Sequence, residues 1–308
     1  MLYEYAVEPK AIASSWQTFR YVIEKFGFDK GRLISEFPRK AWFTEVYAAA
    51  SVLAATDKAR LEILLNQAKG TKVVRMGRPY NRDAGDWMVN ALIEHKRLPF
   101  RAIVASQNGG NNPDVLLADD MNESYPAMAI VNNVAVPRDA TSITFALSGF
   151  IEHGSRVLFV DPYFDFFDAR YKSVLNRCLR VAKEKNPDVV CEIHYRHHER
   201  NVEPSHIELS AAGVFPGVIP TGMKIRVFCW REKKGGADFH ARYLLTDKGG
   251  IGIEAGFAAE GSHQTVDMYL LGLDLCKEKL GTYTYPADSY ELVGPVLLVD
   301  ANGQVSRI

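Results

Sequence analysis

Apolar and polar positions recur along the chain with two periods, one typical of helices and the other of strands. Apolar residues spaced three and four apart predict amphipathic helices. In the stretch 84–97, Trp87, Val89, Leu92 and Ile93 fall near one helical face. The predicted helices cover residues 41–69, 84–97, 140–153 and 167–185. Gly70 is the stop signal that ends the first of them.

Short apolar runs between these helices, bounded by turn residues, predict β-strands. The last two runs are joined by a tight turn that begins at Asp247 and contains two glycines. The predicted strands cover residues 72–77, 100–106, 127–136, 156–161, 188–196, 223–230, 240–246 and 250–254.

Helix and strand alternate in this order, which favours a mainly parallel sheet with helices packed on its faces. We therefore expect an α/β protein built as an α/β/α sandwich. We divide the chain into an N-terminal segment of unknown role (1–40), a first α/β half (41–139) and a second α/β half (140–308).

The two halves could be diverged copies of one repeat. Residues 72–81 align with residues 156–165 when Pro79-Tyr80 is superposed on Pro162-Tyr163, and each segment precedes a predicted helix and strand. The identity is thin, and chance similarity between α/β segments explains it equally well.

Composition then narrows the classes of function. The 308 residues include 37 Lys and Arg against 37 Asp and Glu, so the formal net charge is zero. A protein that coats duplex DNA would be strongly basic, so that class is disfavoured, although a local basic patch stays open. The chain has no apolar run long enough to span a membrane, and its N-terminus lacks the apolar core of a secretory signal. We expect a cytoplasmic protein.

The four cysteines have no spacing that suggests chemistry. None forms a C-x-x-C pair, and two of them lie inside apolar runs. A free cysteine in such a run behaves as a small buried hydrophobe. We expect structural, reduced thiols at Cys178, Cys191, Cys229 and Cys276.

The most informative segment for function is 239–257. It contains His240-x-Arg242-x4-Asp247 in a predicted strand that runs into the tight turn. Residues two apart in a strand share a face, so His240 and Arg242 should point to the same side. Arg suits the oxygens of a phosphodiester, and His can attack phosphorus or protonate the leaving oxygen. An acid such as Asp247 could orient the histidine. The sequence supports this role less strongly than the roles of His240 and Arg242.

This pattern resembles the HKD motif of the phospholipase D superfamily. The upstream order, a strand at 156–161, an amphipathic helix and a strand at 188–196, is also similar to that family. The resemblance implies a phospholipase D-like fold and a metal-independent phosphodiesterase that works without a cofactor through a phosphohistidine. It implies that His240 is nucleophile or acid, that Arg242 binds phosphate and that Asp247 supports the site.

The sequence departs from the family pattern after the motif. The family usually has Lys where this chain has Arg242, a change that keeps the charge. Glu254, Ala255, Gly256 and Phe257 replace the family's Gly-Ser-x-Asn. Candidate substrate-binding residues are therefore Ser262 and Gln264, which could supply the missing groups, together with Glu254 and the aromatic Tyr163.

A second motif is not evident. Superposing the halves places Tyr125, Ala127 and Asn132 where the His, Lys and Asp of another copy would fall. The family pairs two motifs across a pseudo-twofold axis, so a homodimer joining two copies of His240 is the simplest expectation.

Other histidines and basic residues receive plainer interpretations. His194-x-Arg196-x4-Asn201 imitates the motif, but no apolar strand follows it, so we interpret it as coincidence. No ligand set with convincing metal spacing is visible, and we expect no metal. A basic rim and solvated loop charges are alternative interpretations of Arg196, Arg200, Arg231, Lys233 and Lys234.

Three functions remain open at this point. The first is a nuclease-like phosphodiesterase whose substrate is nucleic acid or another phosphodiester. The second is a catalytically silent protein of the same fold that binds nucleic acid or a protein partner. The third is a lipid-directed hydrolase, which would need an exposed apolar rim.

Overall fold

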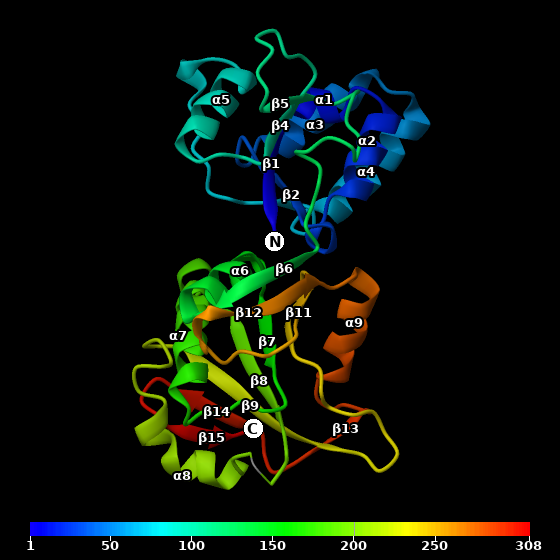
Figure 1. The fold of residues 1–308 in the computed structure, drawn as a ribbon. Helices are drawn as coiled ribbons and strands as arrows, with labels where there is room; N and C mark the ends of the chain where they lie inside the picture. Colours follow the sequence, from blue (N-terminus) through cyan, green and yellow to red (C-terminus); the bar gives the residue numbers. More distant parts are fainter. Residues whose placement is uncertain (200) are drawn as a thin grey trace. The chain divides into compact units, whose positions relative to one another are not determined.

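The computed structural model describes residues 1–199 and 201–308, which form two compact units, Met1–Val131 and Asn132–Ile308. Figure 1 shows the elements of both units, each built from a sheet and its own helices. The boundary differs from the expected one. Residues 1–40 are not a separate segment, because they supply two strands of the first sheet, and residues 132–139 belong to the second unit.

The first unit has five strands and five α-helices among the described residues, with short 3-10 turns at residues 28–30, 50–52 and 82–84. In chain order they are β1 (Tyr3–Val7), α1 (Pro9–Ile12), α2 (Trp16–Lys25), β2 (Arg32–Ser35), α3 (Trp42–Ala49), α4 (Ala55–Ala68), β3 (Val73–Val74), α5 (Trp87–Arg97), β4 (Ala102–Ala105) and β5 (Val115–Leu117).

The sheet of this unit is entirely parallel, with the strand order β3-β2-β1-β4-β5. Successive residues of β1 alternate between its two faces. Tyr5 and Val7 pack in the cluster that contains residues of α1 to α4, whereas Ala6 packs with residues of α5. Because both faces are covered, the strands are mostly apolar, as parallel strands usually are. The polar exceptions are Glu4 in β1 and Arg32 and Ser35 in β2.

The helix predicted over 41–69 is two helices in the structure. The chain leaves the helical conformation at Leu53 and Ala54, which have extended backbone angles between α3 and α4. The helix predicted to start at 84 begins at Trp87, because the Asp86 side chain accepts the Val89 N–H and caps it there.

The second unit contains ten strands and four α-helices among the described residues. They are β6 (Asn133–Arg138), α6 (Ala140–His153), β7 (Arg156–Val160), α7 (Ala169–Lys185), β8 (Val190–Arg196), α8 (Pro204–Val214), β9 (Lys224–Glu232), β10 (Tyr243–Thr246), β11 (Gly250–Ile253), β12 (Gly261–Leu270), α9 (Leu273–Thr282), β13 (Tyr290–Leu292), β14 (Leu297–Asp300) and β15 (Val305–Arg307).

The sheet of the second unit is mixed, with the order β15-β14-β9-β8-β7-β10-β11-β12-β6 and β13 paired to β9. Only β7, β8 and β9 run parallel, because helices α7 and α8 connect them. The remaining pairings are antiparallel, so the expectation of a mainly parallel sheet is wrong for this unit. Short connections such as the 247–249 turn between β10 and β11 can only join antiparallel neighbours.

The two sheets differ in strand number, direction and order, so the described residues do not form the internal repeat that the sequence left open. Both units are α/β, as expected. The four cysteines are free and buried. Burial raises the pKa of the Cys178 thiol to about 12, which keeps it protonated and agrees with a structural role.

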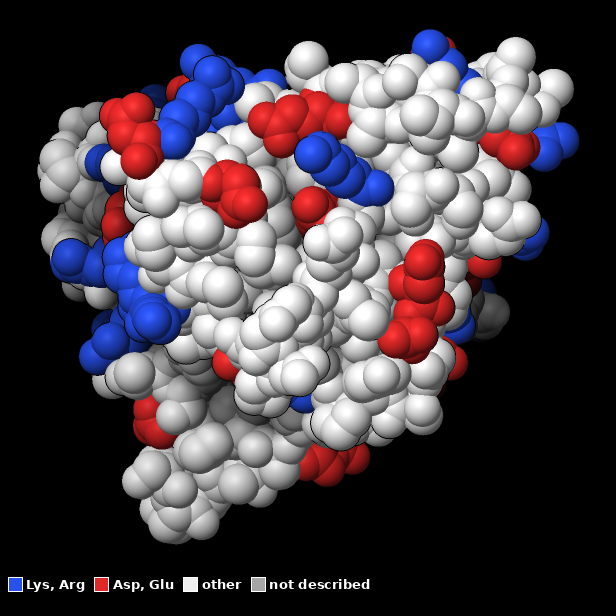
Figure 2. Space-filling view, turned by 90° about the horizontal axis from the view of Figure 1, so that it is seen from above, with Lys and Arg blue, Asp and Glu red and all other residues white. Residues whose placement is uncertain are grey.

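None of the helices in the described part of the chain is long and apolar enough to cross a bilayer. On the face drawn in Figure 2, acidic groups are spread among uncharged surface and basic groups form small separate clusters. That distribution fits the zero net charge.

Candidate active site

The carboxyl ends of the parallel strands β7, β8 and β9 meet at one edge of the second sheet, and β10 starts there because it runs antiparallel to β7. Ligand sites of open α/β sheets form outside such carboxyl ends. Asp161 and Tyr163 follow β7, Arg196 ends β8, Glu232 ends β9, and His240 and Arg242 precede β10. Neighbouring strands therefore bring these residues to one place.

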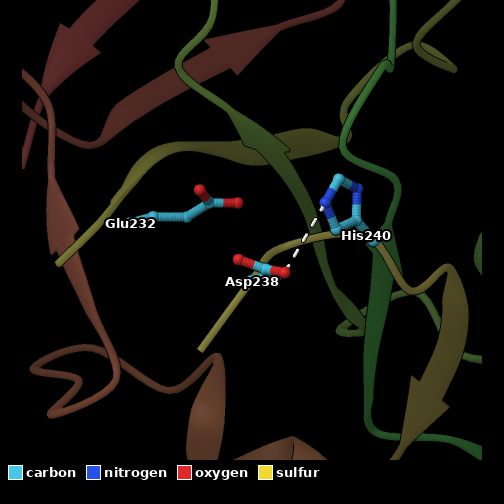
Figure 3. A group of neighbouring side chains, drawn as sticks. All are labelled: Glu232, Asp238 and His240. Atoms are coloured by element: carbon cyan, nitrogen blue, oxygen red, sulfur yellow. Dashed lines mark ion pairs between the residues drawn. The ribbon is translucent and has the colours of Figure 1, made fainter. Parts of the chain in front are cut away.

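His240 lies on the surface of this edge. Its side chain is 61% exposed, between the buried Phe239 and the start of β10. The segment 237–242 has no assigned strand, so the predicted strand begins three residues later than expected. Figure 3 shows the carboxylates of Glu232 and Asp238 beside the His240 ring, whose Nε2 lies 3.9 Å from Asp238 Oδ2. An imidazole in this position is open to a substrate.

Glu232 is held in place by two donors. Its Oε1 accepts the Phe239 backbone N–H at 2.7 Å and pairs with Arg196 Nη1 at 3.2 Å. The backbone N–H of Phe239 lowers the pKa of Glu232, and the Arg196 charge lowers it further against partial burial, which raises it. Glu232 is therefore a fixed negative charge between His240 and Arg196.

Arg242 is anchored but not fully neutralised. Its Nη1 donates to the Glu254 carbonyl at 3.0 Å, and its Nε lies 3.8 Å from Asp161 Oδ1. Burial raises the pKa of Asp161, whereas the Tyr163 and Phe257 N–H groups that it accepts lower it. At 3.8 Å the two groups form an ion pair without a hydrogen bond, so Asp161 positions Arg242 and leaves guanidinium donors available to a ligand.

Gly256 lies against the same pair of side chains. A Cβ there would meet Asp161 Oδ2 at 2.3 Å, and the backbone has a φ of +78°. Both facts require glycine at this position. The glycine at position 256 thus allows the close approach of Asp161.

Tyr163 joins the two arginines. The Arg242 and Arg196 guanidinium carbons lie 5.5 Å and 5.2 Å from its ring centroid, and Arg196 Nη2 donates to its hydroxyl at 3.1 Å. Two cations on one ring give cation–π contacts that keep both guanidinium groups at the edge of the sheet. Arg196 is almost buried, and its Nε has no partner in the described residues.

Asp247 does not belong to this site. It follows the last residue of β10, and that strand alone spans roughly 13 Å. Its Oδ1 accepts the backbone N–H groups of Ser155 at 2.7 Å and Arg156 at 3.3 Å. The expected support of His240 by Asp247 is therefore wrong: the acids beside His240 are Asp238 and Glu232.

The other predicted substrate-binding residues, Glu254, Ser262 and Gln264, lie in different places. Glu254 contributes its carbonyl to Arg242, while its side chain is exposed. Ser262 and Gln264 are exposed on an irregular stretch of β12 between Gly261 and Thr265. The residue of β12 that meets Glu254 is Asp267, and among the described residues Ser262 and Gln264 have no hydrogen bond to His240.

His194 is a structural residue inside the sheet, not a residue of a surface loop. Its ring is fully buried, its Nδ1 accepts the Trp230 indole N–H at 3.0 Å, and its Nε2 lies 3.3 Å from Glu192. Because an indole can only donate, the ring proton is on Nε2 and points to Glu192. Of the proposed basic rim, Arg196 is part of the site, and Arg200 lies outside the described residues.

Sequence reasoning missed Asp161, Glu232 and Asp238. Glu232 is the last residue of β9, and Asp161 directly follows β7. An acidic residue at the carboxyl end of a strand is a sequence signal that could have identified both. Among the described residues, Glu232, Asp238 and His240 also form a group whose ligand atoms all lie within 4.8 Å of one another and that could hold a metal ion. Their spacing in sequence resembles no common metal motif.

No family model matches the chain, and no curated protein matches it. The solved structures that match include TrmBL2, an archaeal chromatin protein whose structure shows a novel mode of DNA binding. The likeness has a TM-score of 0.28 and 15% sequence identity, and it covers 57% of this chain and 59% of that one. The chain thus spans less than two thirds of TrmBL2, and at this TM-score the function has to be argued from the residues themselves.

Proposed function

We propose that the second unit is a metal-independent phosphodiesterase of the phospholipase D type, a nuclease in which His240 forms a phosphohistidine. The observation that carries the proposal is the meeting of an exposed imidazole with two arginines at the carboxyl edge of one sheet. The order β7-α7-β8 ahead of the β10-β11 hairpin also agrees with the resemblance in sequence.

The chemistry follows from these positions. A ring nitrogen of His240 attacks phosphorus and forms the N–P bond, and the bond from phosphorus to the leaving oxygen breaks. Arg242, with Arg196 beside it on Tyr163, neutralises the charge that develops on the non-bridging oxygens. Water then attacks the phosphohistidine, releases a phosphomonoester and restores His240.

Asp238 and Glu232 position the imidazole. A leaving alkoxide also needs a proton donor on the far side of phosphorus. We propose that His240 of a second copy donates this proton, so the proposal includes a homodimer. An ion held by Glu232, Asp238 and His240 would take the imidazole lone pair, so added Zn²⁺ should inhibit.

The decisive experiment compares cleavage of single-stranded DNA, plasmid DNA and RNA in EDTA by the parent and by His240→Ala. We expect cleavage by the parent in chelator and a loss of at least about a thousandfold in the variant, because the nucleophile is gone. His263→Ala is a matched control, since His263 is an exposed histidine of β12 outside the site.

Other outcomes would decide against parts of the proposal. Activity that EDTA removes and magnesium restores would exclude the histidine mechanism. Hydrolysis of phosphatidylcholine vesicles without cleavage of nucleic acid would favour the lipid substrate. Binding of DNA with no cleavage by the parent would favour the silent relative. In that case Arg242→Ala and Arg196→Ala should weaken binding.

A further inference from the structure

The sheet of the first unit has a place where ligands commonly bind, and the phosphodiesterase proposal does not involve it. In the order β3-β2-β1-β4-β5, the chain winds outward from β1 through β2 to β3 and then returns to place β4 on the other side of β1. The strand order reverses between β1 and β4. In open parallel sheets, ligands bind outside the carboxyl ends of the strands at this switch point.

Two adjoining cavities open there. One has a volume of about 630 Å³ and the other about 380 Å³, and both are lined by Glu8, Asp86 and Met88. Glu8 directly follows β1, and Ser106, which lines the smaller cavity, directly follows β4. Each cavity falls in the size range of small-molecule sites. We name them the switch-point crevice.

The polar groups of the crevice are mainly acceptors. Glu8 is held by the Ser106 backbone N–H at 2.8 Å and its hydroxyl at 2.7 Å, both on Oε2. Asp86 uses Oδ1 to cap α5. Within the described part of the chain, Oε1 of Glu8 and Oδ2 of Asp86 have no donor. Glu45 is a third carboxylate in the lining, against a single cation, Lys10.

The same lining disfavours an anion. Folds that bind phosphate at a switch point have a glycine-rich turn after the first strand, whose N–H groups meet the ligand. Here Glu8 and Pro9 take that place, so a carboxylate stands where phosphate would bind and one N–H is missing. The remaining walls include Met88, Leu92 and Trp87.

We propose that the switch-point crevice binds a small organic cation, an amine or guanidinium group carried on an apolar body. The cationic group would donate to Glu8 and Asp86, and the apolar body would lie against Met88 and its neighbours. This function is separate from cleavage by the second unit, and either could fail without the other.

The test is isothermal titration of the full chain with matched pairs of probes that share a carbon skeleton. Tryptamine is compared with indole-3-propionate, and phenethylamine with 3-phenylpropionate. We expect Kd values of about 1 mM or lower for the amines, as for other small ligands, and at least about tenfold weaker binding of the carboxylates. The Met88 methyl signal in NMR should shift with the amine.

Two variants localise the binding. Glu8→Gln and Asp86→Asn keep shape and hydrogen-bond acceptors but remove the charge, so each should raise the Kd of the amines about tenfold. Glu62→Gln is the control, since Glu62 is exposed on α4 outside the crevice. The Asp86→Asn chain retains an N-cap residue, so it serves if Glu8→Gln does not fold.

Three results would overturn the proposal: no binding by either amine, equal binding of an amine and its carboxylate, or equal affinity of the folded crevice variants and Glu62→Gln. Loss of cleavage in the phosphodiesterase assay would have no bearing on these results, because that assay reports on His240.

Discussion

At the scale of the residue, the members of the His240-x-Arg242-x4-Asp247 motif lie in two separate places. His240 and Arg242 meet Glu232, Asp161 and Tyr163 at one end of β10. Asp247 lies beyond the other end of that strand. A one-dimensional motif can therefore combine residues of a site with a residue that stabilises the chain around it.

We predict that Asp247→Ala lowers the free energy of unfolding by about 1–3 kcal/mol, because two backbone N–H groups lose a charged acceptor. Cleavage by the folded variant should match the parent. Urea unfolding and the nuclease assay together check this prediction. A stable but inactive Asp247→Ala protein would return Asp247 to the site.

At the scale of the element, strand β8 contains a polar group inside the sheet. Glu192 is fully buried and pairs with Arg156 at 2.6 Å and Arg226 at 3.2 Å, with His194 on the same strand. Burial alone would raise the pKa of Glu192, but hydrogen bonds from His194 and Arg156 outweigh it and hold the pKa at about 2. A buried carboxylate of this kind is stable only while its partners are present.

The lowered pKa of Glu192 makes the free energy of unfolding depend on pH. The folded pKa of Glu192 lies below its unfolded value of about 4.3, so its contribution is complete above that value. The contribution is lost as pH falls from about 4.3 toward about 2. We predict that Glu192→Gln costs about 3–5 kcal/mol at pH 7 and that the difference shrinks at pH 3. Urea unfolding of both proteins at several pH values measures it; a constant difference would contradict the assignment.

Strands β11 and β12 pack closely where Gly252 lies against the ring of Tyr269. A Cβ on Gly252 would meet the Tyr269 ring at 2.2 Å, whereas one on Gly281 in α9 meets nothing within 4 Å. We predict that Gly252→Ala destabilises by about 1–3 kcal/mol, because the ring must move. Gly281→Ala should be neutral or stabilise by up to about 1 kcal/mol. Thermal unfolding compares them, and equal melting temperatures would refute the prediction.

At the scale of the whole molecule, the chain contains two α/β units but one proposed phosphodiesterase site. The first unit has its own fully parallel sheet and its own crevice, so it is not a degenerate copy of the second. A twofold dimer is the commonest closed assembly and would supply a second His240.

We predict that parent chains mixed equally with His240→Ala chains, after subunit exchange, show about a quarter of the parent activity rather than a half. Only dimers with two intact histidines would then be active, and these are about a quarter of a random mixture. Sedimentation at the assay concentration should show a dimer. An active monomer would contradict the shared site.

The sequence by itself determined much of the local structure. Helix α6 occupies residues 140–153 as predicted, and strands β7, β8, β9 and β11 lie where the apolar runs are. These elements follow from neighbours along the chain: apolar period, caps and turns. His240 and Arg242 were also identified from local spacing, since residues two apart stay close in any extended chain.

Tertiary structure alone decided strand direction, the unit boundary and the partners of His240. The sheet pairs β10 with β7, which are distant in sequence, and this pairing brings Arg242 to Asp161 and Tyr163. The end of β9 places Glu232 beside His240 in the same way. Such contacts depend on how whole strands align across a sheet, and that alignment is set by packing of the complete core rather than by the spacing of a motif.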